Sequence, residues 1–385
     1  MRLPVRASWV LVLGLSTLVL LLAAGCLADR LYKGLKPTPI PHQPPPAGLA
    51  SLSAEGCRAC HAEIYEEWAG SRMGQAFTEP IFQADWNHQG RFYYCLSCHA
   101  PLESQQPLKI TGLSGVSPPV GVGEVNPLFD EALQAEGVTC VVCHLQEGAL
   151  VGPHEVTAPH PTRQDEDFAG EKGCVRCHQL VMPPFPFSRA DRPLADTHAE
   201  WADWKRRTGR TETCTDCHMP PVQRAAAAGA PERAGRRHTF PGGWDDALLR
   251  SGLEVGEVRP GPDGGVVLRL TNQTGHRFPT GDPARALIIS ARFLGPDGET
   301  LGTTERRIER KVRLPMGVEL GDTTLLPAER REIALPAPDV GARKATEITV
   351  TLVYDRLANL PIAHPLELAG RRVELAQRTV SLDGH

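Results

Sequence analysis

Ten of the chain's eleven cysteines fall in five copies of one pattern, Cys-x-x-Cys-His. Two cysteines three residues apart lie on one face of a helical turn, where each thiol can add to one vinyl group of a haem. The histidine that follows can then bind the haem iron from the same side. The pattern therefore predicts five c-type haems. They would be attached through Cys57, Cys60, Cys95, Cys98, Cys140, Cys143, Cys174, Cys177, Cys214 and Cys217, with iron bound by His61, His99, His144, His178 and His218.

Cys-x-x-Cys pairs also occur as zinc ligands or as disulfides. Neither use requires a histidine directly after the second cysteine. The cysteine and histidine content of such a chain gives about 0.01 of these pentapeptides by chance. Five copies therefore favour haem attachment over zinc or disulfide bonds.

The composition agrees with a core built partly from cofactors. Aromatic residues make up only 5% of the 385 residues. Residues 52–245 provide roughly 39 residues per haem motif, too few for a conventional core around each, so haem macrocycles are expected to supply apolar mass there. The net charge of −4 argues against nucleic acid as a partner. No glycine-rich phosphate loop, nucleotide fingerprint or Ser-His-Asp order occurs in the sequence.

The N-terminus predicts export. Arg2 and Arg6 precede an uncharged stretch of 22 residues, Ala7 to Ala28, which is long enough to span a bilayer. The same layout fits a cleaved signal, and Leu22-Ala-Ala-Gly-Cys26 resembles a lipoprotein processing site that would leave a lipid on Cys26. All three alternatives place the bulk of the chain outside the cytoplasmic membrane of a bacterium. The periplasmic side is expected, with an extracellular face as an alternative.

The chain divides by composition into four segments. Residues 1–29 form the signal or anchor, and residues 30–50 a Pro-rich linker, since six prolines lie within ten residues. Residues 51–250 are expected to form a pentahaem cytochrome c domain, and residues 253–385 a β-sandwich domain. The expected fold class is therefore α + β multidomain: a haem-packed, mostly helix and loop domain followed by a β-sandwich.

Local patterns give the expected elements. Helices are expected over 61–70 and 197–208, and loops over 181–186 and 224–237. Alternating apolar residues and Pro-Asp-Gly turns predict strands in the last third of the chain. These strands cover 265–271, 286–293, 306–314, 345–354 and 372–382.

The ligand opposite each motif histidine decides what a haem can do. A second histidine or a methionine gives a low-spin electron carrier, whereas an open position allows chemistry on a substrate. Nine histidines lie outside the motifs. His42 in the linker, His364 before a proline and the terminal His385 are expected to be bystanders.

The stretch Gly56–Ala76 resembles the opening of cytochrome c-554-type multihaem cytochromes, with Trp68 and then Ser71-Arg-Met73 after the first haem motif. In that family a histidine or methionine at the end of this stretch can bind iron, so the resemblance implies Met73 as the second ligand of the first haem. Packing of Met73 against a porphyrin is the alternative. The resemblance continues in Cys214–Pro220, His238–Gly243 and Asn272–Gly281.

For the remaining second ligands the sequence offers several histidines. We rank His238, His276, His154 and His198 first, and His160 and His88 after them. If His276 binds iron, the strand-rich segment and the haem segment form one unit. A structural histidine at the contact between the two is the alternative.

Closely spaced haems favour an electron carrier between a membrane or periplasmic donor and another redox protein, such as a cytochrome or a membrane oxidoreductase. One alternative is a multihaem oxidoreductase with an open-site haem that acts on a small nitrogen or sulfur substrate. Another is a structural subunit of an extracellular cytochrome assembly. All five motifs keep their histidine, which favours the carrier, but the sequence does not decide whether the chain is an enzyme.

The first prediction is the haem count. Denatured protein should keep its colour and gain roughly five haem masses per chain. Replacing Cys95 and Cys98 with alanine should remove one haem, because no thiol of that motif is left to attach it. Mass spectrometry of the denatured variant measures this, and an unchanged haem count would refute the motif assignment.

Overall fold

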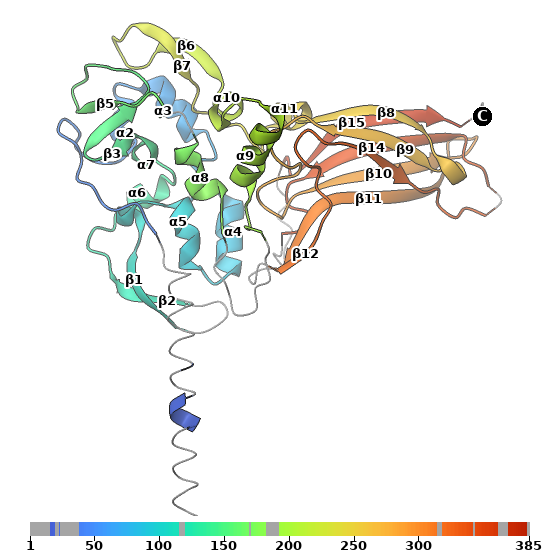
Figure 1. Cartoon of the computed structure of the whole chain (residues 1–385), viewed down its shortest axis with the longest axis horizontal. Coiled ribbons are helices and arrows are strands. Elements are labelled where there is room, and N and C mark those ends of the chain that lie inside the picture. The colour runs from blue at the N-terminus through green and yellow to red at the C-terminus, as the bar shows by residue number, and fades with distance from the viewer. Residues whose placement is uncertain are drawn as a thin grey trace, which may run out of the picture.

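The computed structural model describes residues 16–19, 23, 38–114, 120–168, 171–181, 192–313, 318–341, 343–360 and 369–382. Figure 1 shows two halves side by side. The haem-motif half, within residues 38–251, has short helices and small hairpins, and the elongated strand-rich half, within residues 253–382, has long strands. Cys26, most of the expected anchor, residues 30–37 of the expected linker, His364 and His385 lie outside the described residues. No helix within the described part of the chain is long and apolar enough to cross a membrane.

The haem motifs lie on short helices, and these bring the two cysteines of a motif onto one face. α2 contains the first cysteine of its motif, and the other four helices each end on the motif histidine. Their bounds are α2 (Glu55–Arg58), α5 (Leu96–His99), α7 (Cys140–His144), α8 (Lys172–His178) and α10 (Cys214–His218).

The other helices of this half connect and cover the motif helices. They are α3 (Ala62–Ala69), α4 (Pro80–His88), η1 (Tyr93–Cys95), η2 (Glu103–Gln105), α6 (Glu131–Ala135), α9 (Thr197–Thr208) and α11 (Asp246–Ser251). α3 and α9 confirm the two predicted helices. α9 buries Trp201 and Trp204 and ends at Gly209, whose left-handed conformation (φ 70°) closes the helix.

Strands also occur in the haem-motif half, in three small sheets. They are β1 (Leu108–Ser114) with β2 (Val120–Val125), β3 (Leu145–Gln146) with β4 (Ala149–Gly152) and β5 (Thr162–Gln164), and β6 (Pro221–Ala225) with β7 (Glu232–Arg236). The expected fold class, a mostly helix and loop haem domain followed by a β-sandwich, is therefore wrong. Segment 224–237, expected to be a loop, largely forms the β6–β7 hairpin, in which Pro221 pairs with Arg236 and Ala225 with Glu232. The hairpin satisfies backbone groups that a loop would leave to water.

The strand-rich half contains two antiparallel sheets. One has the order β12-β11-β10-β14-β15 and the other the order β13-β9-β8. The strands are β8 (Leu253–Pro260), β9 (Val266–Asn272), β10 (Ala286–Leu294), β11 (Thr300–Arg313), β12 (Val318–Asp322), β13 (Arg330–Leu335), β14 (Glu347–Asp355) and β15 (Arg372–Ser381), with η3 (Pro262–Gly264) between β8 and β9. This confirms the five predicted strands, while β8, β12 and β13 were not predicted.

The core of this half lies between the two sheets. On β10, alternate residues from Leu287 to Phe293 point inward, and the register pairs Leu287 with Tyr354 and Ile289 with Leu352 of β14. Leu268 of β9 joins the same core from the other sheet. The alternation that revealed these strands in the sequence thus reflects one buried face.

The two halves pack closely together. Trp204 of α9 lies against Gly275, where an added Cβ would come within 3.0 Å of the indole ring. Arg310 of β11 donates to the carbonyl oxygen of Pro193 (2.8 Å), and Arg356 donates to that of Gly243 (2.6 Å). The loop that carries His276 therefore lies directly against the haem-motif half.

Candidate haem centres

Four of the five motif histidines share one hydrogen-bond arrangement, in which Nδ1 lies within hydrogen-bond distance of a backbone carbonyl oxygen. The pairs are His61 with Ala226 (2.7 Å), His99 with Ala76 (2.6 Å), His144 with Val151 (2.8 Å) and His218 with Pro241 (2.6 Å). A proton on Nδ1 fixes the tautomer in which Nε2 carries a free lone pair. This arrangement orients an imidazole for a metal ion at Nε2.

Burial favours the neutral form of three motif histidines. It lowers the pKa of His99, His144 and His178, because a charged imidazolium loses its hydration inside the protein. The hydrogen bonds to Ala76 and Val151 oppose the shift for His99 and His144 but do not reverse it. Iron binds neutral imidazole, so burial supplies the form that a haem requires.

Two histidines outside the motifs face motif histidines. The ring centroids of His144 and His238 are 6.3 Å apart with planes inclined by 24°, and those of His218 and His276 are 6.3 Å apart with an inclination of 18°. Imidazole nitrogen binds a metal at about 2.0–2.1 Å, so two rings that share one metal ion have centroids roughly 6 Å apart. Each pair therefore leaves room for one iron atom between its rings.

The two facing histidines have the same hydrogen-bond arrangement at Nδ1 as four of the motif histidines. Nδ1 of His238 lies 3.1 Å from the carbonyl oxygen of Arg236, and Nδ1 of His276 lies 3.0 Å from that of Arg277. Burial is the largest cause that lowers the pKa of both histidines to about 4. Both rings are therefore neutral near pH 7, as an iron ligand must be.

Glu67 of α3 positions His238. Its carboxylate accepts from the backbone N–H of His238 (2.8 Å) and forms ion pairs with Arg224 (2.9 Å) and Arg237 (2.8 Å). Burial alone would raise the pKa of Glu67, but hydrogen bonds from Arg224 and His238 outweigh it and lower the pKa. No sequence motif predicts this role, because Glu67 and His238 are 171 residues apart in the chain.

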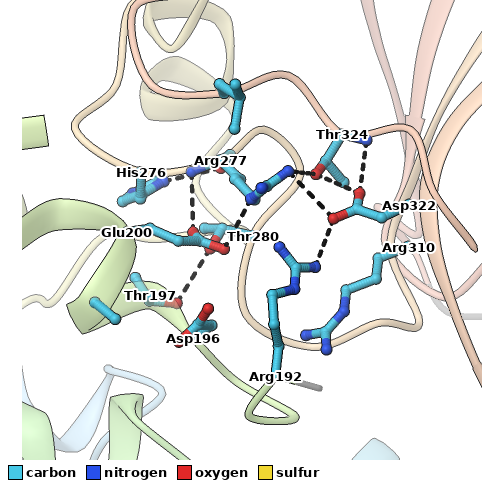
Figure 2. A network of polar contacts seen from close by, with 12 residues as sticks. Arg192, Asp196, Thr197, Glu200, His276, Arg277, Thr280, Arg310, Asp322 and Thr324 are labelled. Carbon is cyan, nitrogen blue, oxygen red and sulfur yellow. Dashed lines mark hydrogen bonds and ion pairs between the residues drawn. The ribbon is translucent and has the colours of Figure 1, made fainter. Parts of the chain in front are cut away.

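A second buried carboxylate positions the loop of His276 (Figure 2). Glu200 of α9 accepts from the backbone N–H of Arg277 (3.0 Å) and from the Thr280 hydroxyl (2.7 Å). Burial raises the pKa of Glu200, against the hydrogen bonds from these two residues. Asp322 adds ion pairs to Arg277 (3.2 Å) and Arg192 (2.5 Å). This network joins α9 to the strand-rich half, and no sequence motif predicted it.

Cysteines of different motifs lie side by side. Their sulfur atoms stand for the thioether sulfurs that haem attachment would create. The thiols of Cys57 and Cys140, of Cys98 and Cys177, and of Cys174 and Cys214 lie close enough to shift each other's pKa. Cys143 is close enough to Cys174 and Cys177 to interact with both thiols electrostatically. The attachment sites thus form a continuous series of motifs one, three, four and five, with motif two beside motif four.

The other predicted ligands remain predictions. Met73 is half-buried, and its carbonyl oxygen accepts from Val138 (3.0 Å), next to the third motif. His154 is exposed. His198 has a buried Nε2 without a hydrogen bond, 3.5 Å from a carboxylate oxygen of Glu171. His160, ranked lower, also has a buried nitrogen without a partner. His88 is exposed.

The donor set fits haem rather than a bare metal ion. No group of three or more His, Cys, Asp or Glu side chains within the described part of the chain could hold a metal ion. A porphyrin supplies four nitrogens and leaves two positions to the protein, which matches histidines in facing pairs. The residues present therefore fit the cofactor that the motifs predict.

No family model and no curated protein matches the chain. Among solved structures it is similar to a penta-heme cytochrome c552 from Thermochromatium tepidum, with a TM-score of 0.61 and 19% identity over 88% of this chain and 100% of that chain. The chain has the fold of a pentahaem cytochrome c. Matches to OgpA of Akkermansia muciniphila and AlkC of Pseudomonas fluorescens have TM-scores of 0.19 and 0.16 over about a third of the chain and carry no argument.

The fold brings together histidines from distant parts of the chain, and the resemblance to cytochrome c-554 stays a prediction. This pentahaem cytochrome fold brings His238 and His276 to motifs three and five. Both residues are in the leading group of candidates for the second iron ligand in the sequence analysis, but the sequence does not assign either of them to a motif.

The facing pairs can be tested by replacing one histidine at a time. His238→Ala and His276→Ala should each convert one low-spin iron to high-spin, because each removes one of two axial ligands. Low-temperature electron paramagnetic resonance measures the change. His42→Ala, at an exposed position that is expected to bind no iron, is the matched control and should leave the spectrum unchanged. Unchanged spectra for His238→Ala and His276→Ala would show that these residues only pack at the site.

Proposed function

We propose that the chain is a multihaem c-type cytochrome that carries electrons between redox proteins through five covalently bound haems. The observation that supports this best is the continuous series of attachment sites, in which Cys57 adjoins Cys140, Cys143 adjoins Cys174, and Cys174 adjoins Cys214. Groups held by neighbouring motifs would themselves be neighbours. The similarity to a penta-heme cytochrome supports the same function.

A bound c-type haem supplies a one-electron couple at its iron. The chain would hold each group by two thioether bonds and one motif histidine. At the third and fifth motifs, His238 and His276 would occupy the opposite side. A pair of fixed, neutral imidazoles leaves no position for a substrate and changes little on oxidation. These two sites therefore suit electron transfer better than catalysis.

One observation favours a second candidate function. Within the described residues, ring contacts with a second histidine occur for His144 and His218 and not for His61, His99 and His178. A site with one protein ligand would leave a position open to a small nitrogen or sulfur compound. The chain would then be a multihaem oxidoreductase with one reactive site and four that deliver or remove electrons.

Electron paramagnetic resonance of the oxidised protein at low temperature separates the two functions. A carrier should show low-spin signals alone, and redox titration should reduce all five haems reversibly. The spectrum should not change when hydroxylamine or sulfite is added. A high-spin signal that is lost on addition of either compound would contradict the carrier and support the oxidoreductase.

We also propose that the chain is exported and held at the outer side of a bacterial cytoplasmic membrane. The uncharged stretch Ala7–Ala28 and Cys26 support this. Where the described chain resumes, Ile40 pairs with the haem-motif half: its N–H donates to Pro101 (2.7 Å), and its carbonyl oxygen accepts from Glu103 (2.8 Å). A short linker would thus hold the haem sites near the membrane and its redox proteins.

Removing the N-terminal segment tests this location. Deletion of residues 1–29, with a cleavable signal supplied instead, should release soluble protein with a full complement of haem. Fractionation and haem staining measure the release, and the full-length chain in the membrane fraction is the control. Soluble full-length protein whose mature N-terminus follows Ala28 would contradict both the anchor and the lipid on Cys26.

A further inference from the structure

Arg285 is a guanidinium group without a carboxylate partner among the described residues. It lies just before β10. Its Nη1 donates to the carbonyl oxygen of Thr280 (3.0 Å), and it is close enough to the buried hydroxyl of Tyr354 to affect the pKa of that group. Neither partner carries a negative charge near pH 7. A half-buried guanidinium with neutral partners leaves part of its desolvation cost uncompensated.

The neighbouring arginines of this junction are paired. Arg277 contacts Asp322 at 3.2 Å, and Arg310 contacts Glu319 at 3.0 Å. Arg285 lines a small cavity with both of them and with Asp196, Glu200 and Asp282, yet it forms no ion pair within the described part of the chain. Arg285 thus differs from these two arginines, because no described carboxylate forms an ion pair with it and its charge could pair with a bound anion.

Arg285 lies between the two loops that present the histidines of the fifth motif. Its Cζ is 3.1 Å from the position of a Cβ on Gly243, two residues after Pro241, whose carbonyl oxygen contacts His218 Nδ1. Its other neighbour, Thr280, follows His276 by four residues. The guanidinium is thus at the edge of this haem site.

We propose that Arg285 pairs with a propionate carboxylate of the haem held by Cys214, Cys217 and His218, and so supplies the positive charge beside that iron. The proposal rests on haem binding at the fifth motif. A guanidinium fork matches a carboxylate in geometry and stays charged at all working pH values. Its charge disfavours ferric iron, which carries one more positive charge than ferrous iron, so Arg285 raises the reduction potential of this haem.

Redox titration of the full-length holoprotein, followed by its visible spectrum, tests the proposal. Arg285→Gln should lower the midpoint potential of the fifth-motif haem most, with a smaller shift at the fourth motif, whose His178 also feels the charge of Arg285, and none at the other three. Arg285→Lys, which keeps the charge, should retain most of the wild-type potential. Arg259→Gln is the matched control, because Arg259 is an exposed strand arginine paired with Glu332 (3.1 Å), and it should shift none of the potentials. Where Arg285→Gln does not accumulate, Arg285→Met removes the same charge.

Two outcomes would overturn the proposal. One is a neutral variant with five haems and wild-type potentials. The other is a wild-type potential that falls as phosphate or acetate is added while Arg285→Gln does not respond, which would make a free anion the partner. Loss of haem from the fifth motif in wild-type protein, seen by mass spectrometry, would instead refute the proposed function.

Discussion

The structure depends on two pairs of half-buried imidazoles that face each other, His144 with His238 and His218 with His276. Four histidines, at the third and fifth motifs, have Nδ1 directed to a backbone carbonyl oxygen and share the gap between their rings. Hydrogen bonds at Nδ1 leave Nε2 as the nitrogen that can bind a metal, and a metal bound only in the folded state stabilises that state. If haem iron binds between these rings, folding of the chain and binding of the cofactors are coupled, which agrees with the scarcity of aromatic residues.

Two carboxylates outside the motifs hold the facing histidines in place. Glu67 binds the backbone of His238 and two arginines, and Glu200 binds the backbone and hydroxyl groups of the loop that follows His276. The balance differs between them: arginine contacts lower the pKa of Glu67, whereas burial raises the pKa of Glu200. Each carboxylate fixes a backbone rather than a ring, so it sets where the ligand stands without competing for iron.

The sequence predicted the elements that depend on residues close together in the chain. The motif helices and α9 follow from local spacing, and the strands of the last third follow from alternation along one buried face. The sequence did not predict which histidine faces which motif. The contacts that position these histidines join distant residues: Glu67 and His238 are 171 residues apart, and Glu200 and Arg277 are 77 apart. The β6–β7 hairpin was missed for a related reason. Its Ala- and Gly-containing strands have no apolar alternation, so their hydrogen bonds to each other alone define them.

The strand-rich half supplies His276, because a loop at the end of its sheets lies against the haem-motif half. The side chain of Asn272 binds the carbonyl oxygens of His276 (2.7 Å) and Leu326 (3.0 Å), and the backbones of Phe278 and Leu325 pair in both directions. A loop tied at both ends to a packed core cannot follow an independent motion of the haem-motif half. If iron links His276 to His218, separation of the halves would break a metal bond as well as the contacts of Glu200. The two halves then form one unit, in which the strands keep the distance between a ligand and its metal constant while the charge on the metal changes.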